Sequence, residues 1–188
     1  MRVYVIRHGE SESNRNRTFA GWLDAHLTEK GRADAAKAGE VLQKLSFDKI
    51  FSSDLSRARE TAEIALPGCE YETSELLREI CVGALAGNSY DTMELEKRLQ
   101  MAKTGYQEFG GESREEHYQR LGAFLNILEA LPYESVAVFS HAGCLRGFLD
   151  IVLGMEHPRD RVVCNNCAML VLEFQDGKWK FYSWTNIS

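Results

Sequence analysis

The chain of 188 residues has no long hydrophobic run and no surplus of basic side chains. Its apolar runs are only as long as a strand, whereas about 20 apolar residues are needed to cross a bilayer, so we expect no membrane-embedded segment. The 22 basic and 28 acidic side chains give a formal net charge of −6. Because nonspecific binding to nucleic acid requires a basic face, this balance argues against a nucleic-acid partner. A small anionic substrate stays compatible with it, since a few local arginines can override the overall charge.

Linkers and export signals are also missing from the sequence. The chain has three prolines and no stretch rich in proline, glycine and serine that would separate domains, so we expect one domain over residues 1–188. Its first residues are apolar too briefly to form the hydrophobic region of a signal peptide. An odd set of five cysteines fits a compartment that keeps thiols reduced, and we therefore expect a cytoplasmic protein.

What the chain does contain is an alternation of strand and helix patterns. Residues 3–6 form a short β-branched and aromatic run, and residues 136–139 form a continuous apolar run typical of a strand buried on both faces. Residues 168–174 and 179–184 are further strand candidates, joined by an Asp-Gly pair that favours a hairpin turn. This order predicts an α/β fold, a single-domain three-layer α/β/α sandwich with a mainly parallel sheet.

Polar residues mark where the helices of this fold should begin. Thr28 can cap one helix, Ser53 or Asp54 can cap the next, and Ser113 opens a capping box before a third. Residues 80–112 are the least regular stretch, with several glycines around a charged helical segment. Because such insertions over a rigid sheet usually cover or shape a site, we expect residues 80–112 to be a lid.

Two histidines share one local pattern. His8 and His141 each follow an apolar strand and precede a small residue. Ligands bind beyond the carboxyl ends of strands in open α/β sheets, so both histidines should lie at the functional edge and face each other if their strands are neighbours. Arg57, near the start of a helix, opposes the helix dipole unless an anion binds between them. A zinc site is the alternative, but an arginine such as Arg7 beside the ligands would repel a dication.

Other histidines and cysteines receive structural interpretations. His26, His117 and His157 have polar or helical neighbours and are expected at the surface. Cys164 and Cys167 have C-x-x-C spacing, but they precede a strand instead of opening a helix, which argues for a strand-entry loop over a redox site.

Six motifs follow one another along the chain. They are R-H-G-E-S-E-S-N at 7–14, G-W-L-D-A-H-L-T at 21–28, S-D-L-S-R-A-R-E-T-A at 53–62, L-R-E at 77–79, G-E-S at 111–113 and S-H-A-G-C-L-R at 140–146. In this order they strongly resemble the signature of the histidine phosphatase superfamily, the group typified by phosphoglycerate mutase. A lone R-H-G would be weak evidence, whereas six motifs in sequence make a chance resemblance negligible.

The resemblance implies a role for each matched residue. His8 would be the nucleophile, attacking phosphorus through one ring nitrogen while a backbone carbonyl orients the other. Arg7, Arg57 and His141 would clamp the phosphoryl oxygens, and Asn14 would add a neutral donor. The resemblance implies no metal and no organic cofactor.

The resemblance also implies a proton donor and contacts to the substrate. Glu79 would protonate the leaving alkoxide and then activate water, which requires a raised pKa or a proton delivered by the substrate phosphate. Gly21, Trp22 and Ala142 are expected beside the substrate, and Tyr90 is expected either to line the mouth or to pack.

The same pocket could serve a phosphatase or a mutase. In the family that the chain resembles, the cofactor-dependent mutases are longer and have an insertion between the Glu motif and the G-E-S motif. Here that interval is short and has no copy of their E-Y-x-R-x-x-P-P-P segment, which favours hydrolysis. Residues 19–24 look more like the mutase loop. The family's frequent G-x-W-E-G reads here as G-A-L-A-G at 83–87, which predicts a more apolar mouth.

We therefore expect a metal-independent phosphomonoesterase that acts on a small phosphorylated metabolite through a phosphohistidine, as a monomer or a homodimer. Phosphoglycerate mutase-type transfer is the alternative within enzymes. A non-catalytic domain that binds phosphorylated ligands is the alternative outside them, and the intact His8, Glu79 and His141 argue against it.

Overall fold

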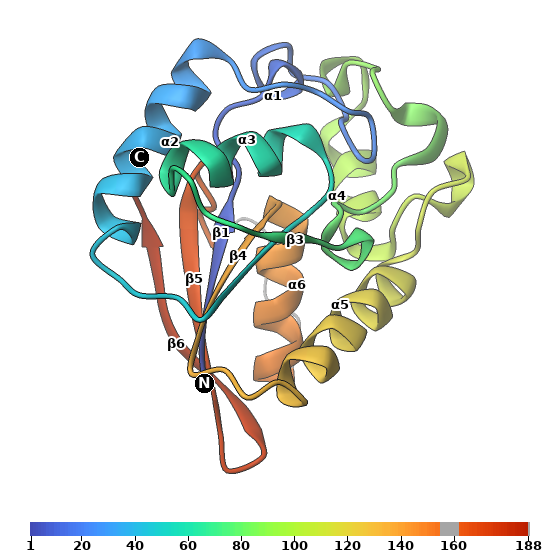
Figure 1. Ribbon diagram of the computed structural model, residues 1–188. Helices are drawn as coiled ribbons and strands as arrows, with labels where there is room; N and C mark the ends of the chain where they lie inside the picture. The colour runs from blue at the N-terminus through green and yellow to red at the C-terminus, as the bar shows by residue number, and fades with distance from the viewer. Residues whose placement is uncertain (155–161, 188) are drawn as a thin grey trace.

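The computed structural model describes residues 1–154 and 162–187, in which helices cover both faces of a six-stranded sheet (Figure 1). The strands lie in the order β3-β2-β4-β1-β5-β6. The first four of these run parallel, whereas β5 and β6 are antiparallel to their neighbours. Their bounds are β1 Arg2–Arg7, β2 Lys49–Ser52, β3 Glu72–Thr73, β4 Ser135–Ser140, β5 Ala168–Gln175 and β6 Lys178–Asn186. The predicted α/β fold with a mainly parallel sheet is confirmed.

The helices alternate with the parallel strands. The α-helices are α1 Glu12–Arg15, α2 Glu29–Leu42, α3 Ser56–Ala65, α4 Leu95–Thr104, α5 Arg114–Glu129 and α6 Ala142–Leu153. Short 3₁₀ helices are η1 Glu75–Leu77, η2 Gly83–Leu85, η3 Tyr90–Thr92 and η4 Gln107–Phe109. None of the helices in the described part of the chain is both long enough and apolar enough to cross a membrane.

The alternating side chains of the central strands build a separate core on each face of the sheet. Val136 and Val138 of β4 pack with α5 and α6, whereas Ala137 and Phe139 pack with α2 and α3. All four side chains are fully buried, as the continuous apolar run predicts. Helices therefore pack on both faces of the sheet, and the sheet provides a rigid support for the residues that follow its strands.

Two of the three predicted helix starts are confirmed. Thr28 accepts from the backbone N–H of Gly31, and Ser113 forms a capping box with Glu116. The predicted cap of α3 at Ser53 or Asp54 is wrong, since Leu55 occupies the N-cap position without a side-chain bond.

A side chain distant in sequence replaces the local cap of α3. The carboxylate of Asp24 accepts from both the backbone N–H and the hydroxyl of Ser56, each at 2.8 Å. Ser53 and Asp54 are engaged elsewhere, with His141 and Arg78 respectively. The loop that precedes α2 is thereby tied to the start of α3.

Residues 80–112 carry η2, η3, α4 and η4, and they have a small apolar core of their own. Val82, Leu85 and Met101 are buried there, with Phe19 and Tyr106 packed against them. This cluster is distinct from the two cores of the sheet. Its role as a lid stays a prediction.

The positions of the remaining histidines and of the cysteines can be compared with their predicted positions. His117 is fully buried on the inner face of α5, so its predicted surface position is wrong, whereas His26 is exposed and His157 lies outside the described residues. All five cysteines are described, and each is a free thiol. Cys164 packs in the core on one face of the sheet and Cys167 in the core on the other, so their C-x-x-C spacing does not form a dithiol site.

Candidate active site

His8 and His141 lie side by side at the carboxyl edge of the sheet. β1 and β4 are parallel neighbours, with Arg7 directly opposite Ser140, so the residues that follow leave the sheet at the same point. The ring centroids of the two imidazoles are 5.2 Å apart. The sequence-based expectation that they face each other holds because their strands are adjacent.

One nitrogen of His8 is fixed by the backbone. Nδ1 lies 2.6 Å from the carbonyl oxygen of Gly9, an acceptor, so Nδ1 carries the proton and Nε2 keeps its lone pair. Burial lowers the pKa of His8 well below its usual range, and the charges of Arg57 and Arg7 lower it further. A neutral imidazole with one available lone pair is a suitable nucleophile.

Gly9 has to be a glycine because the chain passes close to another backbone here. A Cβ at this position would lie 2.3 Å from the carbonyl oxygen of Gly31. The Gly9 N–H donates to Thr61 of α3, which ties the loop after β1 to that helix. The carbonyl that orients His8 is therefore itself held in place.

Two arginines flank His8, Arg57 fully buried and Arg7 half-buried, and part of each guanidinium is unsatisfied. Arg57 donates to the carbonyls of Leu23 and Gly21 at 3.0 and 2.8 Å, and Arg7 donates to the carbonyl of Cys164. The Nε atoms of Arg7 and Arg57 are buried and have no hydrogen-bond partner within residues 1–154 and 162–187. Buried donors in this condition favour an anionic ligand.

His141 is the second imidazole of the pair and is fully buried. Its Nε2 is 2.9 Å from the hydroxyl of Ser53, and its Nδ1 has no partner in the part of the chain that the structure describes. Burial lowers the pKa of His141 well below its usual range, followed by the charges of Arg57 and other nearby groups. His141 is therefore neutral at neutral pH.

Glu79 faces the histidines from the segment after η1. Its Oε1 accepts from the backbone N–H of Ile80 at 2.9 Å, and its Oε2 accepts from that of Gly143 at 3.0 Å. Gly143 lies in the first turn of α6, and a Cβ there would be 2.0 Å from Oε1 of Glu79. Only glycine admits the carboxylate at the start of this helix.

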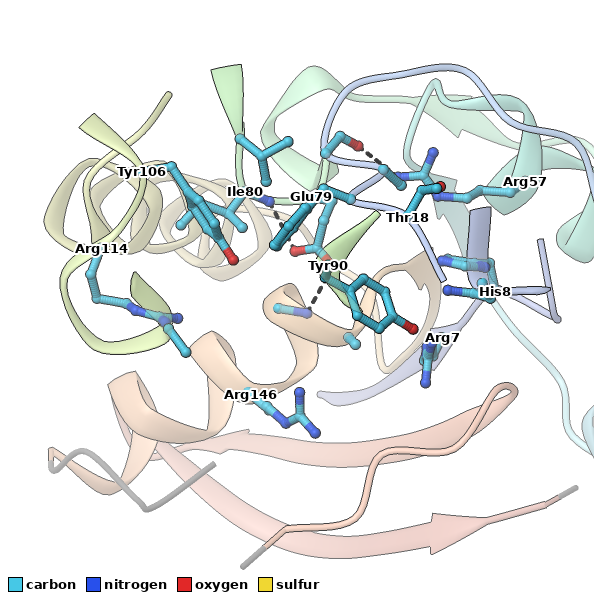
Figure 2. Close-up of a pocket in the computed structure, with 18 residues that line it drawn as sticks. Arg7, His8, Thr18, Arg57, Glu79, Ile80, Tyr90, Tyr106, Arg114 and Arg146 are labelled. Atoms are coloured by element: carbon cyan, nitrogen blue, oxygen red, sulfur yellow. Dashed lines mark hydrogen bonds between the residues drawn. The ribbon is translucent and has the colours of Figure 1, made fainter. Parts of the chain in front are cut away.

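Most of the predicted site residues surround one cavity of about 300 Å³ (Figure 2). Seven predicted site residues line it, namely Arg7, His8, Asn14, Gly21, Arg57, Glu79 and Ala142. His141 and Trp22 are not on its wall. The indole N–H of Trp22 instead donates to the backbone carbonyl of Glu79 at 2.7 Å. Figure 2 shows Arg7, His8 and Arg57 on one side of Glu79 and Tyr106 and Arg114 on the other.

Other residues that shape this cavity were missed or left open by sequence reasoning. Tyr90, expected either to line the mouth or to pack, lines the cavity together with Tyr106, which no motif marks. Ser53 and Thr61 lie inside one of the six motifs, so a signal for them was present. Asn166 donates to the carbonyl of His8 at 3.1 Å and to the side chain of Asn14, and no pattern around it indicates this role.

A metal could be held by one group of described side chains. Atoms of Glu79, His117 and Cys144 lie within 4.8 Å of one another. The guanidinium of Arg120 faces the same space, and burial raises the pKa of the Cys144 thiol to about 12, so it stays protonated. The positive charge of Arg120 beside these three side chains disfavours a divalent ion, and the group fits a structural contact better than a metal centre.

The whole chain matches known proteins. A model of the histidine phosphatase superfamily (branch 1) matches residues 3–187. A Salmonella choleraesuis protein named "Probable phosphoglycerate mutase GpmB" is 33% identical over 98% of this chain and 90% of its own length. The crystal structure of a phosphoglycerate mutase from Thermus thermophilus is 32% identical, with a TM-score of 0.75 over 93% of this chain and 94% of that one.

A further structure supports the fold. An Escherichia coli protein described as a "putative alpha-ribazole-5'-P phosphatase" has a TM-score of 0.85 and 23% identity, covering 100% of this chain and 97% of that one. Two relatives of nearly the same length as this chain carry the name phosphoglycerate mutase, so a short chain does not by itself indicate a phosphatase. From the family model and the relatives together, the chain belongs to the histidine phosphatase superfamily.

Proposed function

We propose that this protein is a phosphomonoesterase that hydrolyses a small phosphorylated metabolite through a phosphohistidine at His8. The observation that carries the proposal is the pairing of a nucleophile with unsatisfied cations. A neutral imidazole, oriented by Gly9, lies between two arginines whose buried Nε–H groups have no partner among the described residues. A phosphoryl group in the cavity would accept from the guanidinium groups of Arg7 and Arg57, which line it, while it presents phosphorus to Nε2 of His8.

The first step forms the phosphoenzyme. The lone pair of Nε2 of His8 attacks phosphorus, and the bond from phosphorus to the ester oxygen breaks with its electron pair going to that oxygen. Glu79 delivers a proton to the departing oxygen, which leaves as an alcohol. Arg7 and Arg57 stabilise the charge on the phosphoryl oxygens. His141, whose ring centroid is 5.2 Å from that of His8, would donate to the same group although its ring does not line the cavity.

The second step returns the enzyme to its starting state. A water molecule attacks phosphorus, and Glu79, now a carboxylate, accepts one of its protons. The phosphorus–nitrogen bond breaks, and its electron pair returns to Nε2 of His8. The sum is one ester and one water converted to one alcohol and one phosphate, with no metal or organic cofactor taking part.

The remaining wall of the cavity indicates what the alcohol resembles. Phe19, Ile80, Val82, Tyr90 and Tyr106 give part of it an apolar and aromatic surface, and two cationic residues, Arg114 and Arg146, lie on the same wall. A cavity of about 300 Å³ suits a small metabolite. Such a wall supports an alcohol with an apolar part, which agrees with the replacement of the family's G-x-W-E-G.

Mutase-type transfer is the second candidate, because a relative at 33% identity carries that name and residues 19–24 resemble the mutase loop. The two activities differ in the acceptor of the phosphoryl group, which is water in one case and a bound hydroxy acid in the other.

The acceptor can be measured directly. The protein is incubated with a panel of phosphorylated metabolites and 4-nitrophenyl phosphate in ¹⁸O-labelled water, while 3-phosphoglycerate isomerisation is followed in parallel. We expect released phosphate to contain one ¹⁸O atom and no isomerisation. Isomerisation faster than phosphate release would contradict the proposal, and a chelator such as EDTA should leave the rate of phosphate release unchanged.

A further inference from the structure

The segment that carries Glu79 has little secondary structure to hold it. η1 ends at Leu77 and η2 begins at Gly83, so the residues between them lie outside any helix or strand. Buried backbone groups in such a segment need partners from elsewhere. A general acid also has to stay within hydrogen-bond reach of the leaving oxygen, so its support bears on the chemistry.

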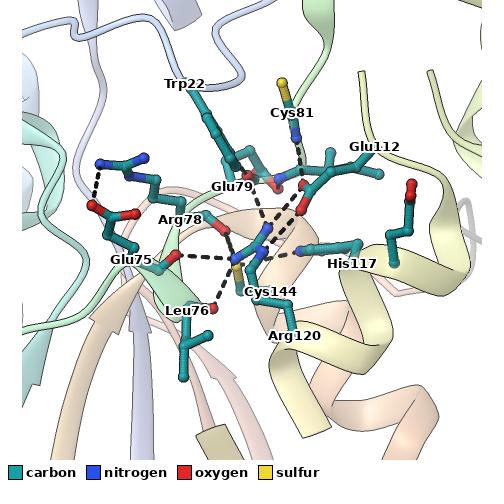
Figure 3. A network of polar contacts seen from close by, with 12 residues as sticks. Trp22, Glu75, Leu76, Arg78, Glu79, Cys81, Glu112, His117, Arg120 and Cys144 are labelled. Carbon is teal, nitrogen blue, oxygen red and sulfur yellow. Dashed lines mark hydrogen bonds and ion pairs between the residues drawn. The ribbon is translucent and has the colours of Figure 1, made fainter. Parts of the chain in front are cut away.

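One side chain of α5 supplies several of these partners (Figure 3). Nη1 of Arg120 donates to the carbonyls of Leu76 at 2.7 Å and Arg78 at 2.8 Å, and Nη2 reaches the carbonyl of Glu79 at 3.3 Å. In Figure 3 the guanidinium lies at the centre of these contacts. A planar group with five N–H donors can bind several carbonyls at once, which a lysine cannot do.

Glu112 fixes Arg120 and also the other side of the catalytic acid. Nε and Nη2 of Arg120 are each 2.9 Å from an oxygen of Glu112. The same carboxylate accepts from the backbone N–H of Cys81 at 2.7 Å, and the Glu112 N–H donates to the Cys81 carbonyl. Arg120 and Glu112 therefore bind the backbone before Glu79, at Glu79 itself, and at Cys81, two residues after it.

We propose that Arg120 and Glu112 are positioning residues for general-acid catalysis, holding the backbone of residues 76–81 so that the Glu79 carboxyl meets the leaving oxygen. The inference rests on the proposed function. Both side chains are mostly buried, and neither lines the cavity, so they act through Glu79 and not on the substrate. Trp22 assists from the opposite side, since its indole binds the same carbonyl of Glu79.

The test compares two esters of similar size that differ in leaving group. 4-Nitrophenyl phosphate releases a stable phenolate and needs little protonation, whereas benzyl phosphate releases an alkoxide that needs a proton. We expect Arg120→Met to lower kcat/KM for benzyl phosphate about 100-fold, as for an acid displaced by about 1 Å, and for 4-nitrophenyl phosphate only a few-fold. Arg120→Lys should recover little, and Glu112→Gln should show the same selectivity to a smaller extent.

Two controls separate positioning from loss of stability. Leu128→Ala removes a fully buried side chain about two turns further along the same helix, and it should lower the unfolding midpoint without changing the ratio between the two esters. Arg120→Met added to Glu79→Gln should lower benzyl phosphate hydrolysis no more than a few-fold further, since the group it positions is already gone.

The outcomes distinguish the inference from the proposed function. Equal loss on both esters, an unchanged ratio, or the same ratio change in Leu128→Ala would overturn the positioning role alone. A wild type that hydrolyses only the nitrophenyl ester has no working general acid and would also overturn it. A wild type inactive on both esters would overturn the proposed function and the inference together.

Discussion

The two sides of the cavity are built differently. The phosphoryl side consists of Arg7 and His8, at the end of β1, and Arg57, in the first turn of α3. It is hydrogen-bonded to the sheet, for example through the His8 N–H, which donates to the carbonyl of Ser140 at 2.9 Å. The 80–112 segment on the other side rests on short helices and a small apolar cluster of its own. The phosphoryl side therefore belongs to the central sheet and its helices, whereas the 80–112 segment packs beside them with its own small core.

This difference separates the reaction from the choice of substrate. Transfer of a phosphoryl group requires donors and a nucleophile in fixed positions, which a rigid sheet edge provides. Selection of the alcohol requires only a wall that can vary in shape, which an irregular segment provides. Changes on the phosphoryl side should therefore affect all substrates equally, and changes in the 80–112 segment should alter their ranking.

The largest of these effects is expected at Arg57. Arg57→Met removes charge and donors from the developing phosphoryl transition state, and we expect kcat/KM to fall about 10²–10³-fold on every substrate. Arg59→Met is the matched control, because Arg59 lies on the same helix and is exposed. Loss that depends strongly on the alcohol would contradict a role confined to the phosphoryl group.

A smaller and more selective effect is expected at Tyr90. Its ring lines the cavity from the 80–112 segment and contacts Phe19, with centroids 5.7 Å apart. We expect Tyr90→Ala to change the ratio of kcat/KM between an aromatic and a small polar phosphate about 10-fold, the size of a typical apolar contact. Tyr182→Ala, at an exposed position of β6, serves as the control. An equal fall in kcat/KM for both substrates would contradict a role of Tyr90 in substrate selection.

The buried histidines should also make stability depend on pH. The pKa values of His8 and His141 are lowered well below 6.5 in the folded protein, so below pH 6.5 the unfolded chain binds more protons than the folded one. The free energy of unfolding therefore falls as the pH drops from 6.5, by about 1.4 kcal/mol per pH unit for each histidine.

Replacement of one histidine isolates its contribution. Chemical denaturation of wild type and His141→Asn between pH 7 and pH 5 should give a shallower slope in the variant by about that amount. Parallel slopes would show that His141 is not held neutral by burial.

Much of the phosphoryl side could be predicted from the sequence. The two apolar strands end in His8 and His141, and the rule that ligands bind at the carboxyl edge of a parallel sheet places both at one site. Thr28 and Ser113 cap their helices because the groups they bind are only three residues away. Each of these features depends on neighbours in sequence or on a regular sheet.

Contacts between distant segments could not be predicted in the same way. Ser53 and Asp54 have the right chemistry to cap α3, but His141 and Arg78 engage them, and Asp24 binds the helix start instead. Local propensity gave way here to tertiary contacts.

His117 shows a signal that was present but not used. It precedes Leu121, Phe124 and Leu128 at helical spacing on the buried face of α5, which places it inside. Tyr106 had no comparable signal, because an irregular segment has no period from which its inward side can be read.

The central claim is that phosphate passes through His8, and trapping the intermediate tests it most directly. The protein is mixed with 4-nitrophenyl phosphate, quenched in alkali, where phosphohistidine survives, and analysed by mass spectrometry of its peptides. We expect phosphate on His8 in the wild type, none in His8→Ala, and a fall in turnover of at least about 10⁴-fold in that variant. The control His26→Ala, at an exposed histidine outside the cavity, should retain both label and activity. Undiminished turnover by His8→Ala, or label on another residue, would contradict the account.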